Sequence, residues 1–324
     1  MMGKTRLGFD IGSSSMKVAV RQGGSVRLEE AALPENLVDS GGIALPHAFA
    51  QFLRQAKKDL RLPRGEAALV LPPSQVICRM VTMPRMTTEQ LLMNLPYEFT
   101  DFIQGVADQY YCDYALCESA GEEEEEGLTM MTAAAAKQTL AEYARIFSQA
   151  GLRLRTVLPQ EMALIRLVQG RSEEEFCFVD LGHQNTRITV VWRDRVQATR
   201  QIALGGRNLD LAVGDELGVD AFLSNTYKTT NFQNVQTLPV LAEVCERIAV
   251  EILKVVNFYQ FTYRSSNLEG VYLVGGGTAL PVLRQAIEST VGLPLLDPET
   301  LLPGAAGDVP AGVFAAGAAM GGTR

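Results

Sequence analysis

Two short segments of the chain share one pattern of residues, and that pattern suits phosphate chemistry. The first segment, residues 10–20, begins Asp-Ile-Gly-Ser-Ser-Ser, and the second, residues 180–190, begins Asp-Leu-Gly-His-Gln-Asn. Each follows an apolar run and leads into another apolar or β-branched run, which predicts a β-hairpin with a tight glycine turn. Each turn supplies one carboxylate, Asp10 or Asp180, and several backbone N–H donors. Such donors bind phosphate oxygens, and two opposed carboxylates suit a hydrated Mg²⁺ ion.

Two equivalent hairpins in the two halves of the chain indicate a duplicated lobe, with the hairpin tips facing each other across a cleft. At 324 residues the chain is long enough for two lobes of typical domain size. Hydrophobic residues make up 47% and charged residues 20% of the chain, as in an ordinary folded soluble protein. The alternative interpretation is that each Asp only caps its own turn and that no ligand is shared.

Composition argues against several other classes of protein. The net charge of −8 and the isoelectric point near 5.0 argue against a general binder of nucleic acid or anionic membranes. With only two histidines, a His-rich metal centre is excluded and a Ser-His-Asp triad is disfavoured. The five cysteines form no Cys-x-x-Cys pair, which favours reduced thiols. The N-terminal residues lack a signal-peptide core, and no apolar run approaches the roughly 20 residues that span a bilayer, so we expect a cytoplasmic protein.

Three other phosphate-binding motifs are absent from the sequence. It contains no Gly-x-x-x-x-Gly-Lys-Ser/Thr P-loop and no protein-kinase signature. The Gly12 turn leads into a strand rather than a helix, which excludes the dinucleotide-binding fingerprint. What remains is the pair of hairpins and a third glycine turn, Gly275-Gly276-Gly277, between a predicted strand and a predicted helix.

Hydrophobic periodicity predicts the elements that position these turns. In the first half it predicts strands within residues 4–33, 67–71, 75–83 and 110–117, and helices over 46–60, 87–103 and 137–150. Residues 128–135 fit either a strand or the start of a helix, and a helix over 156–169 is expected to link the lobes. The acidic run Glu122–Glu126 is interpreted as a solvated loop. In the second half it predicts strands within 176–203 and 268–274, and helices near 208–217, 219–229, 240–264 and after Pro281.

The order of these motifs resembles the ATPase superfamily of actin, Hsp70 and the sugar kinases. Within it, residues 74–151 resemble the inserted subdomain of the cell-division and pilus-assembly branch. The most similar group is the PilM family of type IV pilus inner-membrane assembly proteins. That likeness rests on the stretches Leu-Gly-Phe-Asp-Ile-Gly-Ser-Ser-Ser-Met-Lys-Val, Met-Pro-Arg-Met-Thr-Thr-Glu-Gln, Gln-Ala-Gly-Leu and Leu-Gly-Gly-Arg-Asn-Leu.

The resemblance implies an α/β fold of the actin-like ATPase class, with duplicated ribonuclease H-like lobes and an inserted β-α-β-β-α subdomain in the first lobe. The implied division assigns residues 1–73 and 152–171 to the core of the first lobe and residues 74–151 to the insert. It assigns residues 172–206 and 236–324 to the core of the second lobe, with residues 207–235 as a small subdomain of that lobe.

The resemblance also implies a Mg-ATP site. Asp10 and Asp180 are expected to flank Mg²⁺ through water. The expected nucleotide contacts are Gly12, Ser13, Ser14, Ser15 and Lys17 in the first lobe, and Gly182, Asn185, Thr186, Lys228, Gly275, Gly276 and Gly277 in the second. Asn225 stands three residues before Lys228, where family members usually carry Glu. Gln160 is expected to orient the attacking water, with Glu161 as the alternative. Because glutamine is a poor general base, any ATP hydrolysis is expected to be slow.

The implied function is that of a scaffold at the cytoplasmic face of the inner-membrane platform of a type IV pilus or related pseudopilus. The scaffold is expected to bind the cytoplasmic N-terminal tail of a PilN-like membrane protein and to reach the membrane only through it. The expected groove lies between the first lobe and the insert and involves strands and helices within residues 74–113. Other pilus components and self-association are compatible with this interpretation. One alternative is a small-molecule kinase of the same superfamily, and another is a cell-division filament protein resembling FtsA. The sequence shows neither a clear catalytic Asp signature for the first nor, at residues 313–320, an amphipathic membrane helix for the second.

Overall fold

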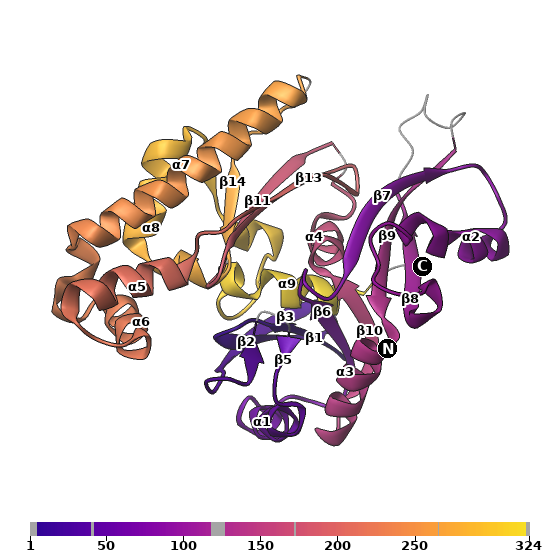
Figure 1. Cartoon of the computed structure of the whole chain (residues 1–324), viewed down its shortest axis with the longest axis horizontal. Helices are drawn as coiled ribbons and strands as arrows, with labels where there is room; N and C mark the ends of the chain where they lie inside the picture. The colour runs from indigo at the N-terminus through magenta and orange to yellow at the C-terminus, as the bar shows by residue number, and fades with distance from the viewer. Residues whose placement is uncertain (1–4, 40–41, 118–126, 172, 265, 322–324) are drawn as a thin grey trace.

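The two hairpins lie in separate five-stranded sheets in the computed structural model, which describes residues 5–39, 42–117, 127–171, 173–264 and 266–321. The first sheet consists of β1 (Arg6–Ile11), β2 (Ser15–Gln22), β3 (Ser25–Ala32), β6 (Glu66–Leu71) and β10 (Arg153–Pro159). The second consists of β11 (Glu175–Leu181), β12 (Thr186–Trp192), β13 (Arg195–Ile202), β14 (Val271–Val274) and β15 (Leu295–Leu296). Their strand orders, β10-β6-β1-β2-β3 and β13-β12-β11-β14-β15, contain the same antiparallel meander beside parallel strands. This repeat confirms the duplicated lobes (Figure 1).

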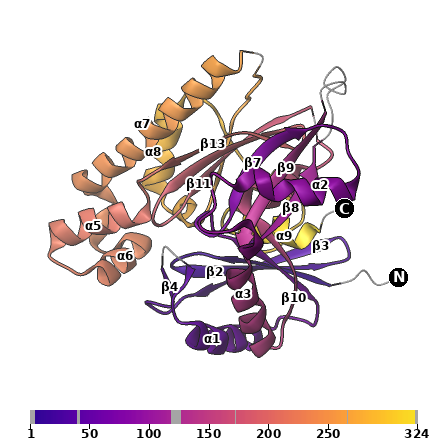
Figure 2. The same ribbon diagram turned by 45° about the vertical axis from the view of Figure 1, so that its right-hand side comes forward.

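Buried alternate residues anchor the first hairpin. The register of β1 and β2 sets Asp10 opposite Lys17, and β1 also pairs in parallel with β6. Below the tip, Phe9 is fully buried, and its ring lies 5.1 Å from that of Phe147 in an edge-to-face arrangement. Phe147 belongs to α3 (Lys137–Gln149), which lies beside α1 (Pro46–Asp59) on the outer face of the sheet (Figure 2). Burial of each such side chain stabilises the lobe by about 1.5–3 kcal/mol.

The insert forms a small sheet of its own beside the first lobe. Its antiparallel strands are β7 (Ile77–Met83), β9 (Leu128–Ala136) and β8 (Tyr110–Leu116), in that order, and α2 (Thr88–Asn94) follows β7. A reciprocal cap starts α2: the Gln90 N–H donates to Thr87 Oγ1 at 3.2 Å, and the Thr87 N–H donates to Gln90 Oε1 at 3.0 Å. Residues 128–136 form a strand because β9 is paired on both sides. The acidic run Glu122–Glu126 lies outside the described residues.

The expected helix over residues 156–169 is wrong in its first part. Residues 153–159 form β10, which pairs in parallel with β6, and α4 (Gln160–Val168) begins only at Gln160. The pairing with β6 satisfies the backbone of this segment, and the β-branched residues Thr156 and Val157 suit an extended conformation. As a result, Gln160 directly follows a strand of the first-lobe sheet.

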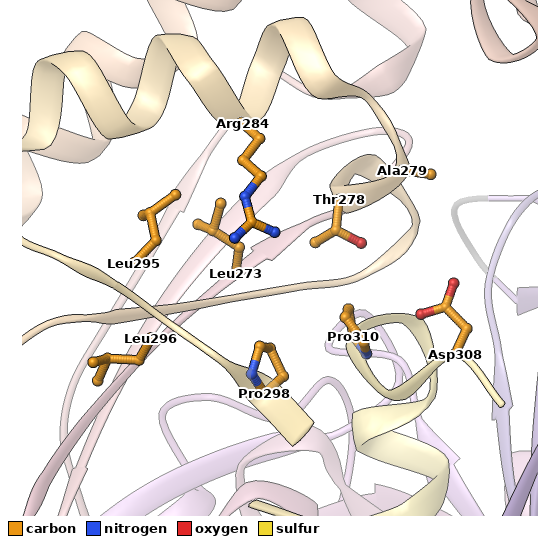
Figure 3. Close-up of a pocket in the computed structure, with 9 residues that line it drawn as sticks. All are labelled: Leu273, Thr278, Ala279, Arg284, Leu295, Leu296, Pro298, Asp308 and Pro310. Carbon is orange, nitrogen blue, oxygen red and sulfur yellow. The ribbon is translucent and has the colours of Figure 1, made fainter. Parts of the chain in front are cut away.

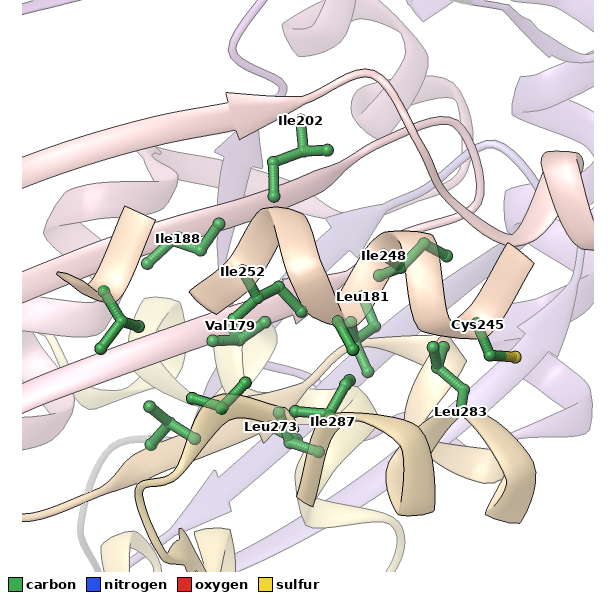
Figure 4. Close-up of a cluster of buried hydrophobic side chains, with 14 of the residues drawn as sticks. Val179, Leu181, Ile188, Ile202, Cys245, Ile248, Ile252, Leu273, Leu283 and Ile287 are labelled. Atoms are coloured by element: carbon green, nitrogen blue, oxygen red, sulfur yellow. The ribbon is translucent and has the colours of Figure 1, made fainter. Parts of the chain in front are cut away.

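Two long helices cover the outer face of the second sheet. These are α7 (Pro239–Thr262) and α8 (Pro281–Val291), each with Pro in its first turn, as helix starts favour. Figure 4 shows Ile248 and Ile252 of α7 packed against Val179 of β11, with Ile287 of α8 beside them. Two further helices, α5 (Gly206–Leu217) and α6 (Ala221–Thr230), extend from the same lobe.

The last helix, α9 (Val309–Met320), lies between the two lobes (Figures 1 and 2). Val313 and Phe314 join a buried cluster that includes Leu164 of α4 and Phe178 of β11. Gly317 lets α9 approach α4 closely, because a Cβ there would overlap the carbonyl of Ala163. The apolar segment at residues 313–320 is therefore part of the buried core. None of the helices in the described ranges is long and apolar enough to span a bilayer.

Candidate functional site

The strand order brings the candidate turns to facing sheet edges. In the first sheet, β1, β6 and β10 run in parallel, so Asp10 and Gln160 lie at the same carboxyl-terminal edge. In the second sheet, β11 and β14 run in parallel, so Asp180 and Gly275 share the corresponding edge. Ligands of α/β sheets bind at such carboxyl-terminal edges.

The two hairpin turns close in the same way. The Gly12 N–H donates to the carbonyl of Ser15 at 3.0 Å, and the Gly182 N–H donates to the carbonyl of Asn185 at 3.1 Å. A Cβ on Gly12 would lie 3.1 Å from the Ser15 oxygen, and one on Gly182 would lie 2.7 Å from the Asn185 oxygen. A side chain would therefore crowd both turns, more severely at Gly182 than at Gly12, and each glycine leaves a cradle that a side chain would fill.

The carboxyl groups of Asp10 and Asp180 interact across the lobes. Burial raises the pKa of both groups, and the charge of Asp10 helps to raise the pKa of Asp180 to about 7. Lys17 opposes both shifts and Arg187 opposes that of Asp180. A like charge has this effect only at short range, so the two carboxyl groups lie near one another. Two close, partly buried carboxylates are a donor set that fits a divalent cation.

Among the described residues, no group of three or more His, Cys, Asp or Glu side chains could by itself hold a metal ion. A cation between Asp10 and Asp180 would therefore need water or phosphate oxygens to complete its coordination. This is the usual situation for Mg²⁺, which dehydrates reluctantly and binds through one or two carboxylates plus substrate phosphates.

The residue seven positions after each Asp is basic, and the two basic residues have different partners. Lys17 lies opposite Asp10, and its Nζ is 3.8 Å from Glu30 Oε1. Arg187 lies opposite Asp180, but its guanidinium donates to Glu161 Oε1 at 3.1 Å and to Gln201 at 2.9 Å. The sequence analysis missed Arg187, although the equal spacing in the two repeats was the signal that could have found it.

Lys228 is buried beneath the second hairpin in an ion pair. Its Nζ lies 2.5 Å from Asp210 Oδ1 and donates to the carbonyl of Gly206 at 3.2 Å. The Gly206 N–H in turn donates to the carbonyl of Gly182 at 3.0 Å, so the lysine supports the turn through the backbone. Asp210 was another residue that the sequence analysis missed.

His183 extends the same cluster. Its Nδ1 lies 3.6 Å from Asp210 Oδ2. Burial lowers the pKa of His183, against the opposing effect of the Asp210 carboxylate. A neutral imidazole at this place adds no fixed charge to the site.

The third glycine turn packs directly on the second hairpin. Gly275 has a φ of +86°, and a Cβ there would overlap Asp180 Oδ1. A Cβ on Gly277 would lie 2.7 Å from the Cβ of Leu181, whereas Gly276 faces open space. The turn is held from behind, because the Gly275 N–H donates to the carbonyl of Pro310 at 2.9 Å.

A cavity of about 160 Å³ adjoins this turn. Figure 3 shows Arg284 of α8 extending toward Thr278, with Asp308 and Pro310 on the other side. The cavity is smaller than the roughly 300–1,000 Å³ of typical ligand pockets, so we assign no ligand to it.

Two lobes of the same topology, each with an Asp-x-Gly hairpin at the shared cleft, define a protein of the actin-like ATPase fold. Residues 8–298 match the family model described as type IV pilus assembly protein PilM. The chain therefore belongs to this family.

Solved structures agree with this fold. The chain is similar to a structure described as the PilM-PilN type IV pilus biogenesis complex, with a TM-score of 0.77 and 20% identity over 97% of both chains. It is also similar to the ethanolamine utilization protein EutJ from Carboxydothermus hydrogenoformans (TM-score 0.58, 16% identity, 98% of this chain and 88% of that one). A third is (R)-2-hydroxyglutaryl-CoA dehydratase component A from Acidaminococcus fermentans (TM-score 0.50, 12% identity, 98% and 97%). No curated protein matches the chain.

Proposed function

We propose that the chain binds Mg-ATP between its lobes and acts as a scaffold at the cytoplasmic face of the membrane platform of a type IV pilus or related pseudopilus. Its partner there is the cytoplasmic N-terminal tail of a PilN-like membrane protein. Family membership supports the pilus-assembly role, and a similar structure is described as a PilM-PilN complex. The observation that carries the nucleotide part is the interaction of Asp10 with Asp180 from opposite lobes.

In this proposal each lobe supplies half of the nucleotide site. Asp10 and Asp180 hold Mg²⁺ through water, and Lys17 supplies the first lobe's ammonium to the phosphates. Backbone and hydroxyl donors come from Gly12, Ser13, Ser14 and Ser15 in the first lobe and from Gly182, Asn185 and Thr186 in the second. Gly275 and Gly276 leave room for the ribose and the α-phosphate, with Gly277 setting the turn against the sheet. Bound Mg²⁺ supplies the positive charge that offsets the carboxylates and the phosphates.

Any ATP hydrolysis in this site is slow in our proposal. Gln160 is the first residue of α4 and follows β10, the strand beside β6, and this position supports a role in orienting the attacking water. Glu161, the alternative, is engaged in an ion pair with Arg187, whose guanidinium donates to Glu161 Oε1 at 3.1 Å. A glutamine aligns water without accepting its proton, which limits the rate.

The insert carries a surface that supports partner binding. Several of its large apolar side chains are exposed, with Tyr97 at 75% and Met93 at 62%. The Arg79 guanidinium lies 4.0 Å from the ring centroid of the exposed Phe102 and also bonds to the carbonyl of Glu98. Exposed apolar groups of this kind mark interaction sites, and they lie within residues 74–113.

One side chain connects this insert with the cleft. Glu161 pairs with Arg187 of β12 and also bonds to the thiol of Cys78 in β7, which helps to raise the pKa of Cys78 above its ordinary value. A change at the second hairpin therefore has a short physical route to the insert. We propose that Mg-ATP biases the partner groove in this way, as a binding switch.

The test uses labelled synthetic N-terminal tails of bitopic membrane proteins encoded near this chain, titrated with and without Mg-ATP. A cognate tail is expected to bind, and its affinity is expected to change when Mg-ATP is added. Tyr97→Ser is expected to lower that affinity about tenfold, which corresponds to about 1.4 kcal/mol. Phe222→Ser on α6 is the matched control, because Phe222 is similarly exposed at 64% but lies in the second lobe. Absence of binding by every tail, or equal losses in both variants, would remove the proposed partner surface.

A further inference from the structure

A groove lies between strand β13 and the end of helix α7. It encloses about 360 Å³, within the range of ligand-binding pockets. Cys177, Val190 and Ala198 form its floor on the sheet, and Val255 and Tyr259 of α7 form its wall. It is separate from the nucleotide cleft, because β11 begins beside Tyr259 and ends at the Asp180 turn.

The rim of this groove is unusually apolar for an exposed helix end. Phe258, which lines the groove, is 56% exposed, and Phe261, one turn further along α7, is 75% exposed. In Figures 1 and 2 these turns project beyond the sheet. Neighbouring aromatic rings of this kind are costly in water and mark a surface that another molecule covers.

Strand β13 is the edge of its sheet and pairs only with β12 among the described strands. Two backbone carbonyls of β13 accept hydrogen bonds from side chains, where a neighbouring strand would otherwise donate. Tyr263 Oη donates to the carbonyl of Gln197 at 3.0 Å, and Arg200 Nη1 donates to that of Thr199 at 3.1 Å. Each carbonyl oxygen has a second lone pair, so this edge can still accept hydrogen bonds from an added peptide.

The first lobe shows how the duplicated fold covers the corresponding edge. Its strand β3, the counterpart of β13, forms a parallel bridge from Arg27 to Ala306. The Leu28 N–H donates to the carbonyl of Ala306 at 2.7 Å, and the Ala306 N–H donates to that of Val26 at 3.0 Å. Leu28 also packs against Val309 in an apolar cluster. An extended segment of the chain thus occupies this edge in one lobe.

The charge of the groove favours an acidic occupant. Arg200 is exposed at its mouth, with the guanidinium 5.8 Å from the ring centroid of Phe258. Among the residues that the structure describes, none of those that line the groove is a carboxylate, although the chain as a whole has a net charge of −8. A partner carboxylate would pair with Arg200, while apolar side chains of the same partner would enter the groove beneath it.

We propose that this groove binds an extended peptide of a partner protein. The peptide carries apolar side chains at alternate positions and a carboxylate that pairs with Arg200, and its backbone adds to the edge of β13 beyond Gln197. The proposal does not depend on the nucleotide site or on the insert. It gives the second lobe a docking surface of its own.

The test is a display selection against the whole chain. The library consists of eight-residue peptides with Val or Ile fixed at alternate positions and the other positions random. Peptides enriched in Asp or Glu are expected, and Arg200→Glu should weaken their binding by at least about tenfold, as loss and reversal of a charge-assisted contact would. Arg145→Glu on α3 is the matched control, because Arg145 is an exposed arginine in a weak ion pair on the first lobe.

Two further measurements distinguish peptide binding in this groove from peptide binding elsewhere on the chain. Ala198→Trp fills the floor and should abolish binding, while N-methylation of alternate peptide amides should do the same by removing backbone donors. Because Ala198→Trp can disturb folding, its unfolding midpoint is compared with that of Arg200→Glu, a surface change. Peptides that bind all variants equally would overturn the proposal. So would a concentration-dependent dimer that Arg200→Glu disrupts, since the occupant would then be a second copy of the chain.

Discussion

Glu161 of helix α4 and Arg187 of strand β12 form an ion pair of 3.1 Å that joins the two lobes beside the cleft. Each side chain is only 12% exposed. Arg187 lies opposite Asp180 in the second hairpin, and Glu161 directly follows Gln160. The pair therefore fixes the position of the second hairpin relative to the helix that carries the proposed catalytic glutamine.

Removal of Glu161 should destabilise the protein. Glu161→Ala leaves the Arg187 guanidinium largely buried with only Gln201 as a side-chain partner, which we expect to lower the free energy of unfolding by about 1–3 kcal/mol. Urea unfolding monitored by circular dichroism measures the loss. The control is Glu142→Ala, because Glu142 forms an exposed pair with Arg145 at 3.8 Å and such pairs contribute about 0–1 kcal/mol. Equal losses in the two variants would show that the inter-lobe pair has no special role.

Charge at the first hairpin should determine nucleotide affinity. Asp10→Ala removes a proposed metal contact and Lys17→Ala a proposed phosphate contact, so each is expected to lower Mg-ATP affinity by about tenfold or more. Isothermal titration calorimetry measures the affinity. Glu30→Ala should not lower it, since Glu30 only neighbours Lys17 at 3.8 Å and faces solvent. If both hairpin variants kept the affinity of the unmodified chain, the phosphate assignment would be untenable.

Gly275 should tolerate no side chain, for steric as well as conformational reasons. A methyl group there would overlap Asp180 Oδ1, and the φ of +86° already disfavours other residues. Gly275→Ala is therefore expected to displace Asp180 and to lower Mg-ATP affinity. Gly292→Ala is the matched control, because Gly292 has a similar φ of +72° but open space around it. Gly292→Ala should cost about 1–2 kcal/mol of stability without changing affinity. An unaltered affinity in Gly275→Ala would contradict the packing of this turn on the site.

The pKa of Asp180 predicts a distinct pH dependence of stability. Burial and the charge of Asp10 raise this pKa to about 7 from the ordinary value of 3.8, so between these values the folded chain binds more protons than the unfolded chain. The contribution of Asp180 to stability is thus present below about pH 4 and is lost as pH rises through about 7. Asp180→Asn should therefore gain stability relative to the unmodified chain between pH 5 and pH 8, in urea titrations at a series of buffers without metal.

Titration of the Asp180 carboxyl should also make Mg-ATP affinity depend on pH. Because the proposed metal site uses the carboxylate form, Mg-ATP affinity should rise as pH increases from about 6 to 8. Proton release on binding, measured by calorimetry in two buffers of different ionisation enthalpy, checks this directly. A flat pH profile in the unmodified chain would mean that Asp180 does not titrate in this range.

Much of the fold could be predicted because its strongest signals are local. A hairpin turn and the alternation of its strands lie within about 20 residues, so the sequence alone placed both Asp-x-Gly turns and the element order of the insert. The duplicated pattern then determined that the chain has two lobes. The helix expected over residues 156–169 failed at its start, because pairing of β10 with β6, far earlier in the chain, decided the structure of that segment.

Only the tertiary structure decided the pairing of charges. Arg187 pairs with Glu161, and Lys228 with Asp210, through the packing of separate elements, which no helix or strand period relates. The groove beside β13 likewise exists because α7 crosses a strand that precedes it by several elements. Sequence patterns report which face of an element is apolar. The partner of a buried charge depends on how whole elements pack, because its energy comes from a neighbour brought within a few ångströms by the fold.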